Sequence, residues 1–256
     1  DIDKNELAKK HVKPDIGIVA DAKQFLQKLN MTLTEDIQWE RWLQKCYEWK
    51  RRFPNVLPEQ RNQNEFVNSY FFVDELSDHL NNNEVIVTDM GTSFTCTYQT
   101  FKIKKGQRII TSSGLASMGW GLPASIGACF AHNKNRTICI TGDGGLQFNV
   151  QELQTIKHHN LPIKIFFIDN GGYTTMREAF NRTLKGTYIG ADKESGVSLP
   201  DFVQVAKAYG LPADCVVTHK DLKNKLNSIL ERDGPFVANI KIDPKQQLIP
   251  RMISKT

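Results

Sequence analysis

The sequence lacks any run of about 18 apolar residues, so we expect no segment that crosses a membrane. We also expect no secretory signal peptide. Its five cysteines are widely separated and form no CxxC pair, which argues against a zinc site and against a disulfide framework. These absences predict a cytoplasmic protein with reduced thiols, and Cys129 and Cys139 lie in patterns typical of small core residues.

The sequence also lacks a strong excess of charge of one sign. Lys and Arg number 33, Asp and Glu number 28, and the formal net charge is +5. The basic cluster at 49–52 is short, and no nucleic-acid-binding motif accompanies it. We interpret the cluster as the solvated face of a helix, and we expect no nucleic-acid partner.

Two common nucleotide-binding motifs are missing. The segment GDGG at 142–145 follows the apolar run 137–141, but the third position of a dinucleotide-binding fingerprint is Gln147 rather than glycine. No phosphate loop of the form GxxxxGK followed by Ser or Thr occurs. The chain is therefore expected to be neither a Rossmann dinucleotide enzyme nor a P-loop protein.

From residue 65 onward, strand and helix patterns alternate. Short runs rich in Val and Ile predict strands at 84–89, 107–111, 137–141, 163–168, 214–218 and 236–242. Helical patterns lie between them at 115–132, 148–160, 198–210 (with Ser198 as N-cap and Gly210 as stop) and 222–232. Because the strands are apolar on both faces, we predict an α/β fold, a doubly wound, mainly parallel sheet with helices on both faces.

The first 64 residues differ from the rest. The pattern at 1–30 predicts a strand end, a loop, a second strand and a helix, which cannot close a core alone. Residues 36–53 predict an amphipathic helix with apolar residues at helical spacing. These residues, which we expect to pack into a core rather than to bind a ligand, are Trp39, Leu43, Cys46 and Trp49.

Asp143 and Asn170 each follow a predicted strand, and a helix connects the two strands. If the strands are neighbours in a parallel sheet, their carboxyl ends meet at the edge where such sheets bind ligands. A carboxylate and an amide oxygen suit Mg²⁺, which takes further ligands from phosphates. Gly144 and Gly145, which lack side chains, would let their N–H groups approach a phosphate. The segment therefore indicates a Mg²⁺–diphosphate anchor, with a tight turn capped by Asp143 as the alternative.

The spacing of these motifs resembles that of thiamine-diphosphate enzymes. GDG, a gap of 24 residues and then DN at 169–170 resembles their GDG and NN motif, and residues 111–131 are similar to acetolactate synthases and 2-oxo acid decarboxylases. The resemblance covers essentially the whole chain. It implies residues 1–34 as the tail of a central domain, 35–61 as a linker helix and 62–256 as the diphosphate-binding domain of a thiamine-diphosphate-binding fold. The N-terminal pyrimidine domain of the family is absent from this chain.

The resemblance implies a role for ten residues. Asp143 and Asn170 would bind Mg²⁺ through their side chains and Gly172 through its carbonyl. The residues beside the diphosphate would be Gly91, Thr92, Ser93, Gly144 and Gly145. The Ala116 carbonyl and the Met118 N–H would bind the aminopyrimidine, and the Met118 side chain would bend the cofactor. From the residues alone, a buried methionine filling space in a helix is an equal alternative for Met118.

The implied activity is that of a thiamine-diphosphate- and Mg²⁺-dependent enzyme that decarboxylates a 2-oxo acid and ligates the remaining acyl unit to a second carbonyl compound, as acetolactate synthases do. The alternatives are a non-catalytic module that binds a diphosphate cofactor and a simple 2-oxo acid decarboxylase. Binding of FAD, which the central domain would govern, stays open.

The glutamate that activates the cofactor in this family comes from an N-terminal domain, normally of the partner subunit, and it is not in this chain. We therefore expect the chain to be the C-terminal piece of a longer enzyme and inactive alone. Its partners would be its own N-terminal domain and a second subunit, in a homodimer or homotetramer.

The sequence departs from the family pattern at several positions. Asp169 stands where the first Asn of NN is usual, and Gly145 stands where decarboxylases often have Ser. Residues 92–94 replace the Gln-His-Gln typical of acetolactate synthases, and Ala179 replaces a Trp that selects the acceptor. The smaller Ala179 predicts a bulkier or more polar acceptor. Arg177 would bind a carboxylate or phosphate of the substrate or, equally, form a surface ion pair with Glu178.

Overall fold

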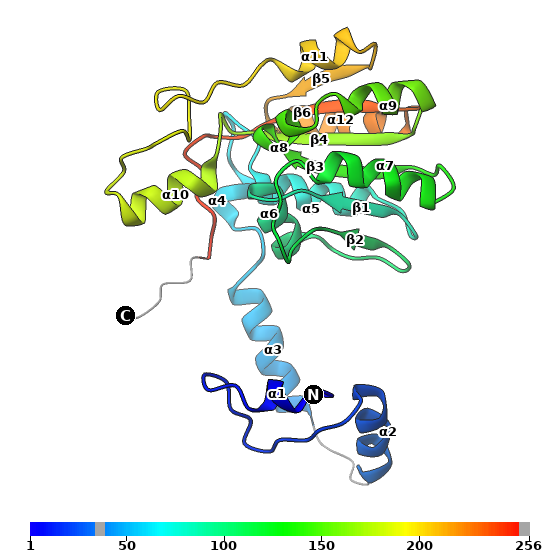
Figure 1. Cartoon of the computed structure of the whole chain (residues 1–256), viewed down its shortest axis with the longest axis vertical. Helices are drawn as coiled ribbons and strands as arrows, with labels where there is room; N and C mark the ends of the chain where they lie inside the picture. Colours follow the sequence, from blue (N-terminus) through cyan, green and yellow to red (C-terminus); the bar gives the residue numbers. More distant parts are fainter. Residues whose placement is uncertain (34–38, 251–256) are drawn as a thin grey trace. The chain divides into compact units, whose positions relative to one another are not determined.

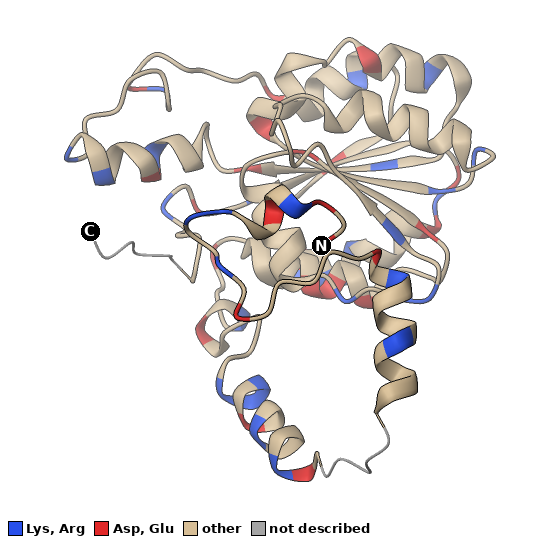
Figure 2. Cartoon of the chain, turned by 60° about the horizontal axis from the view of Figure 1, so that its bottom comes forward, with Lys and Arg blue, Asp and Glu red and all other residues tan. Residues whose placement is uncertain are grey.

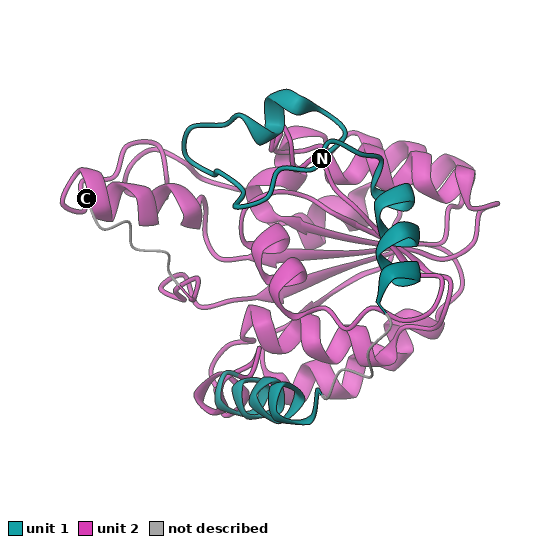
Figure 3. Ribbon diagram, turned by 90° about the horizontal axis from the view of Figure 1, so that it is seen from below, with its two compact units in different colours: residues 1–53 teal, residues 54–256 magenta. Residues whose placement is uncertain are grey.

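The computed structural model describes residues 1–33 and 39–250. The chain forms two compact units, residues 1–53 and residues 54–256, shown in teal and magenta in Figure 3. Each unit is described by itself.

The first unit consists of helices and irregular segments. Its helices are α1 (Lys4–Leu7), α2 (Ala22–Thr32) and α3 (Glu40–Arg52). The prediction of strands within residues 1–30 is wrong, because no strand occurs there. Helix α3 lies within the predicted 36–53, although residues 36–38 are outside the described residues.

The apolar side chains of α3 do not form the predicted core. Trp39 is 54% exposed, Leu43 and Trp49 are also exposed, and Cys46 is only partly covered. No residue described in 1–53 is buried. A unit of this size with so few elements offers no opposing apolar layer, so its aromatic residues stay in contact with solvent.

The second unit is built on a six-stranded sheet in which all described strand pairs are parallel. The strands are β1 (Val85–Thr88), β2 (Arg108–Ile110), β3 (Thr137–Gly142), β4 (Ile163–Asp169), β5 (Ala213–Val216) and β6 (Phe236–Lys241). Figure 1 shows their order, β2-β1-β3-β4-β6-β5. The predicted α/β class is confirmed, and so is the pairing of β3 with β4.

Helices cover both faces of this sheet and bury two separate apolar clusters. One cluster joins the strands to α5 (Ser69–His79), α6 (Thr92–Thr100) and α12 (His219–Glu231). The other joins them to α7 (Gly121–Ala131), α9 (Glu152–His159) and α11 (Phe202–Ala208). Successive side chains of one strand point to opposite faces of the sheet. In β4, Phe166 packs in the first cluster and Phe167 in the second. Cys129 and Cys139 are buried in the second cluster, as predicted.

Three predicted helices begin elsewhere. The helix expected at 115–132 begins at Gly121, because Ala116 (φ 55°) and Gly119 (φ 80°) take left-handed conformations that end any helix before it. The helix expected at 148–160 is α9, which begins at Glu152, and a separate short helix, α8 (Asp143–Phe148), precedes it. Helix α11 is capped by Asp201 rather than by Ser198, since the Asp201 side chain accepts the N–H groups of two residues of its first turn. Gly210, with φ 73°, follows this helix as predicted.

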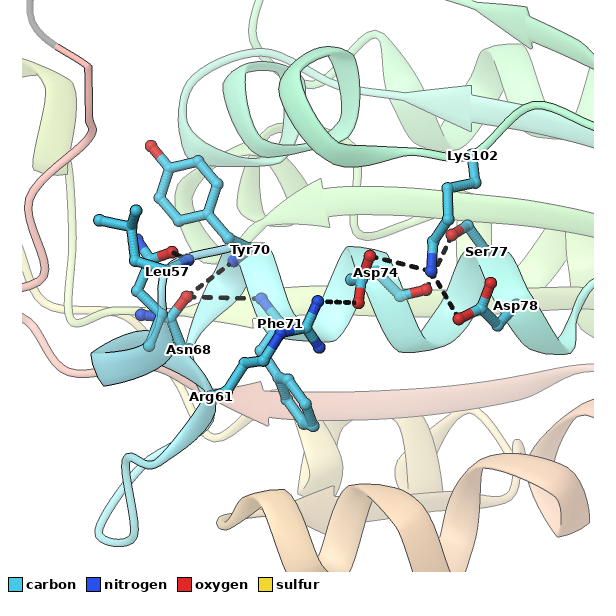
Figure 4. Close-up of polar contacts among 10 residues, drawn as sticks. Leu57, Arg61, Asn68, Tyr70, Phe71, Asp74, Ser77, Asp78 and Lys102 are labelled. Atoms are coloured by element: carbon cyan, nitrogen blue, oxygen red, sulfur yellow. Dashed lines mark hydrogen bonds and ion pairs between the residues drawn. The ribbon is translucent and has the colours of Figure 1, made fainter. Parts of the chain in front are cut away.

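The segment before α5 is fixed to it by polar contacts (Figure 4). Asn68 caps α5 by accepting the N–H groups of Tyr70 (3.0 Å) and Phe71 (3.4 Å). Arg61, at the end of the short helix α4 (Pro58–Arg61), pairs with Asp74 at 2.8 Å, and Lys102 bridges Asp74 and Asp78. These contacts orient α5 and thereby one covering layer of the sheet.

Charged residues of both signs are scattered over the helices and loops (Figure 2). Within residues 1–33 and 39–250, no helix is both long enough and apolar enough to cross a membrane.

Candidate functional site

A cavity of about 350 Å³ opens at the carboxyl ends of β1, β3 and β4. The chain passes from β1 to β2 on one side and then to β3 on the other, so β1 and β3 flank a topological switch point, where open parallel sheets bind ligands. Nine of the ten predicted site residues line this cavity: Gly91, Thr92, Ala116, Met118, Asp143, Gly144, Gly145, Asn170 and Gly172. The tenth, Ser93, does not line it, because its side chain is buried and its hydroxyl donates to the Met90 carbonyl at 2.9 Å.

Asp143 is the first residue of α8 and is almost fully buried. Its Oδ1 accepts the N–H of Gly144 (2.7 Å), and its Oδ2 accepts the N–H of Gly172 (3.0 Å), which joins the loops after β3 and β4. Within the described parts of the chain, no Lys or Arg pairs with this carboxylate. Burial raises the pKa of Asp143 to about 6, against the opposing effect of the two amides. A bound cation would stabilise the charged form.

Asn170 follows β4 and supplies the second polar side chain. Its Nδ2 donates to the Thr92 hydroxyl at 3.3 Å, which orients the amide. Its Oδ1 is buried and has no hydrogen-bond partner among the described residues. A buried acceptor without a partner costs about 1–3 kcal/mol, a cost that a hard cation at this point would remove. The carboxylate of Asp143 and the oxygen of Asn170 therefore fit a magnesium ion.

The loop after β4 depends on glycine. Gly171 has φ 70° and Gly172 has φ 125°, conformations that residues with a Cβ rarely adopt. A Cβ on Gly172 would also collide with the Ala191 carbonyl. Asp169, at the end of β4, lies outside the cavity, and its carboxylate binds Asn239 and Lys241 of β6. Because Lys241 neutralises Asp169, an aspartate is accommodated where the family usually has asparagine.

Met118 lies on a loop rather than in a helix, and its side chain is 41% exposed, so it does not fill the core. The loop is held by Asp89, whose Oδ2 accepts the N–H of Gly119 at 3.0 Å, and by Asn149, whose amide donates to the Gly119 carbonyl at 2.7 Å. The same Asp89 oxygen accepts the hydroxyl of Thr141 on β3. Burial raises the pKa of Asp89. This residue thus ties the loop that carries Ala116 and Met118 to the ends of two strands.

Asp89 was not predicted to support the site, although its position at the end of the predicted strand 84–89 was a signal for it. Tyr173 and Met176 were also missed, and both line the cavity. A Cβ on Gly144 would collide with the Tyr173 ring and approach Met118 Cε to 3.2 Å, so Gly144 leaves room for these two side chains. Gly145 lacks a side chain for another reason, since a Cβ there would collide with Asp89.

Arg177 takes neither of its predicted roles. It lies on α10 (Thr174–Thr183), is only 7% exposed and does not line the cavity, so it is neither a surface residue nor a substrate contact. Its guanidinium donates to neutral oxygens, most of which are main-chain carbonyls of the loop after β4 and of two other segments. Ala179, on the same helix, is half-buried and does not line the cavity.

The sequence matches known proteins along its whole length. Residues 89–240 match the family described as "Thiamine pyrophosphate enzyme, C-terminal TPP binding domain". An acetolactate synthase large subunit of Cyanidium caldarium is 32% identical over 98% of this chain and 42% of that protein. A probable acetolactate synthase large subunit of Methanocaldococcus jannaschii is 35% identical over 97% of this chain and 42% of that protein. The chain thus spans about two fifths of the length of these relatives.

Proposed function

Because this chain belongs to the thiamine pyrophosphate enzymes, as the C-terminal part of a protein of the acetolactate synthase type, we propose that it binds thiamine diphosphate through Mg²⁺ and serves a 2-oxo acid decarboxylase and carboligase. One observation carries the proposal. The buried carboxylate of Asp143 and the Oδ1 of Asn170, which has no partner within residues 1–33 and 39–250, lie on one cavity at the switch point of the sheet. A carboxylate oxygen and an amide oxygen at this place suit a hard cation that also binds a phosphate group.

In this proposal, different residues of the cavity bind different parts of the cofactor. Asp143 and Asn170 hold Mg²⁺ by their side chains, and Gly172 holds it by its carbonyl. The residues proposed to bind the diphosphate are Gly91, Thr92, Ser93, Gly144 and Gly145, with Ser93 acting through its main chain because its hydroxyl is already engaged. The Ala116 carbonyl and Met118 would bind the aminopyrimidine, and the Met118 side chain would hold the cofactor in a bent conformation.

When bound, thiamine diphosphate supplies an electron sink for cleavage of the bond between the carboxylate and the carbonyl carbon of a 2-oxo acid. The chain contributes position and electrostatics. The loop held by Asp89 and Asn149 fixes Met118, so that orientation is set before the substrate arrives. Tyr173 and Met176 add apolar surface to the cavity wall.

The activating glutamate is proposed to come from an N-terminal domain of a second subunit. Glu84 cannot take this role, because it pairs with Arg136 at the amino end of the sheet. The domain assignment remains part of the proposal, with 1–34 as the tail of a central domain, 35–61 as a linker helix and 62–256 as the cofactor domain. The proposal also includes assembly as a homodimer or homotetramer and a cytoplasmic location. It further includes the inactivity of these 256 residues alone.

The acceptor is proposed to be larger or more polar than the 2-oxo acid used by ordinary acetolactate synthases, since Ala179 replaces a large aromatic residue of those enzymes. A product screen of the full-length protein with pyruvate and assorted aldehydes and 2-oxo acids tests this. Acetolactate as the sole efficient product would contradict the larger acceptor, and CO₂ release without ligation would indicate a simple decarboxylase.

Binding is tested separately from catalysis. Calorimetry of thiamine diphosphate with the full-length protein should show affinity that depends on Mg²⁺, and Asp143→Ala should abolish that dependence while the protein stays folded. Unchanged affinity would remove Asp143 from the metal site. Binding without decarboxylation of any 2-oxo acid by the full-length protein would favour the second candidate, a non-catalytic module.

A further inference from the structure

We propose that Arg177 is the positioning residue of the loop 170–172, and that its guanidinium sets the backbone shape on which metal affinity depends. The inference rests on the proposed function of this loop as a Mg²⁺ ligand. It assigns a role to a buried cation that the cofactor chemistry itself does not use.

The first evidence is the contact between Arg177 and the loop. Nη2 donates to the Asn170 carbonyl at 3.0 Å, and Nη1 donates to the Gly171 carbonyl at 3.2 Å. Arg177 therefore holds two of the three loop carbonyls, and among the described residues it makes no hydrogen bond to the third, that of Gly172, which is the proposed metal ligand. The planar fork of an arginine suits this task because it fixes several acceptors in one plane.

The second line of evidence is that the conformation of the loop must be fixed by contacts from outside it. The left-handed conformations of Gly171 and Gly172 are accessible to glycine but not preferred by it, so a loop containing both has many alternative shapes. The Gly172 N–H also donates to Asp143 Oδ2 at 3.0 Å. A change in the loop would therefore displace two proposed metal ligands, Asn170 and Gly172. It would also break the hydrogen bond between Gly172 and the third proposed ligand, Asp143.

The third evidence is the set of segments that Arg177 joins. Its Nη1 also lies 3.4 Å from the Ala191 carbonyl, and its Nη2 donates to the Pro244 carbonyl at 3.2 Å. The Ala191 carbonyl accepts the N–H of Tyr173 as well, at 2.8 Å. The next residue, Glu178, accepts the N–H of Leu248. Helix α10 thus fastens the metal loop to the segment around Ala191 and to the segment after β6.

Arg177 itself does not line the cavity, so it would act through the residues that it contacts, chiefly through the main chain of the loop. Residues that orient metal ligands typically change metal affinity by about 10–100-fold when they are replaced. The expectation differs from that for a purely structural arginine, whose loss would lower the melting temperature without a specific effect on the metal.

The experiment compares Arg177→Lys with Arg182→Lys in the full-length protein. Both residues lie on α10, but Arg182 is exposed and provides the matched control. Lysine keeps the charge but cannot reach all five oxygens. Titration with Mn²⁺ in the presence of thiamine diphosphate should show a loss of about tenfold or more for Arg177→Lys and no change for Arg182→Lys.

A second arm uses hydrogen exchange in the metal-free protein. Amides 171–173 should exchange faster in Arg177→Lys than in wild type, whereas amides of β3 and β4 should not change. Arg177→Ala with millimolar guanidinium, well below denaturing concentrations, should regain part of the lost Mn²⁺ affinity.

Unchanged Mn²⁺ affinity in Arg177→Lys, or a loss accompanied by uniform acceleration of exchange and no rescue, would overturn the inference. A wild-type protein that binds no Mn²⁺ would instead defeat the proposed function. In that case the exchange of amides 171–173 in the metal-free protein still decides whether Arg177 holds the loop.

Discussion

The two ends of the parallel sheet treat buried polar groups in opposite ways. At the amino end, each buried charge has a partner: Lys164 of β4 donates to the carbonyls of Arg232 and Gly234, and Glu84 forms an ion pair with Arg136, although Glu84 Oε2 and Arg136 Nε have no hydrogen-bond partner among the described residues. At the carboxyl end, Asp143 has only main-chain donors, and Asn170 Oδ1 has no partner among the described residues. Burial therefore has a different role in each place. The polar groups at the amino end stabilise the fold, whereas those at the carboxyl end remain available to bind a ligand.

The largest expected effect is at Asn170. Asn170→Ala removes the unpartnered acceptor, and we expect the affinity for Mg²⁺ and thiamine diphosphate to fall by more than about 100-fold, since direct ligands exceed the effect of outer-shell partners. The melting temperature of the metal-free protein should stay the same or rise, because a buried polar atom without a partner is removed. Calorimetry and a thermal melt measure the two quantities. A large drop in melting temperature with unchanged affinity would assign Asn170 to the fold.

Met118, at the carboxyl end of the sheet, is also expected to affect activity more than stability. Met118→Leu keeps the bulk of the side chain and should retain most of the activity of the full-length enzyme. Met118→Ala should lower kcat on the order of 10- to 100-fold through misorientation of the cofactor, while the melting temperature changes little because the side chain is 41% exposed. Steady-state kinetics with CO₂ detection checks this, and equal kcat for Met118→Ala and wild type would remove Met118 from the site.

The amino end should show the reverse behaviour. Glu84→Gln leaves Arg136 without its carboxylate, and we expect a loss of about 1–3 kcal/mol in the free energy of unfolding. Affinity for thiamine diphosphate should not change, since Glu84 lies at the other end of the sheet. Denaturant unfolding and calorimetry of one preparation test both parts. Weakened cofactor binding at constant stability would break the comparison between the two ends.

The smallest expected effect is the pH dependence due to Lys164. Burial lowers the pKa of Lys164 to about 8, so the unfolded chain binds its proton more tightly than the folded chain. Stability contributed at this position therefore rises with pH between about 8 and 10.4 and is lowest below that range. The difference in unfolding free energy between wild type and Lys164→Met should move in favour of wild type over this range. A difference that stays constant or moves the other way would show that the Lys164 charge is not destabilised by burial.

Local apolar patterns were enough to predict the sheet, because its four inner strands, β1, β3, β4 and β6, are short runs rich in apolar residues that are buried on both faces. The positions of Asp143 and Asn170 followed from the same runs, since polar residues at the ends of neighbouring parallel strands must lie close together. The start of α7 was missed because propensity could not reveal the left-handed conformation of Ala116.

Long-range contacts account for the other errors. Arg177 binds carbonyls of residues as distant in sequence as Pro244, and Asp89 binds Gly119 and Thr141, so neither role is visible in a local pattern. The aromatic residues of α3 show the helical spacing of a core face, yet they are exposed, because the pattern indicates an apolar face but not whether the same unit provides a layer to cover it.

The most direct test of the central claim is one titration of thiamine diphosphate, with and without Mg²⁺, into three forms of the full-length protein: wild type, Asp143→Ala and Lys164→Met. The account predicts binding that requires Mg²⁺ in wild type and in Lys164→Met, and no such binding in a folded Asp143→Ala. Mg²⁺-dependent binding that survives in Asp143→Ala, or that is lost in a folded Lys164→Met, would contradict the division of the sheet into an end that stabilises the fold and an end that binds the ligand.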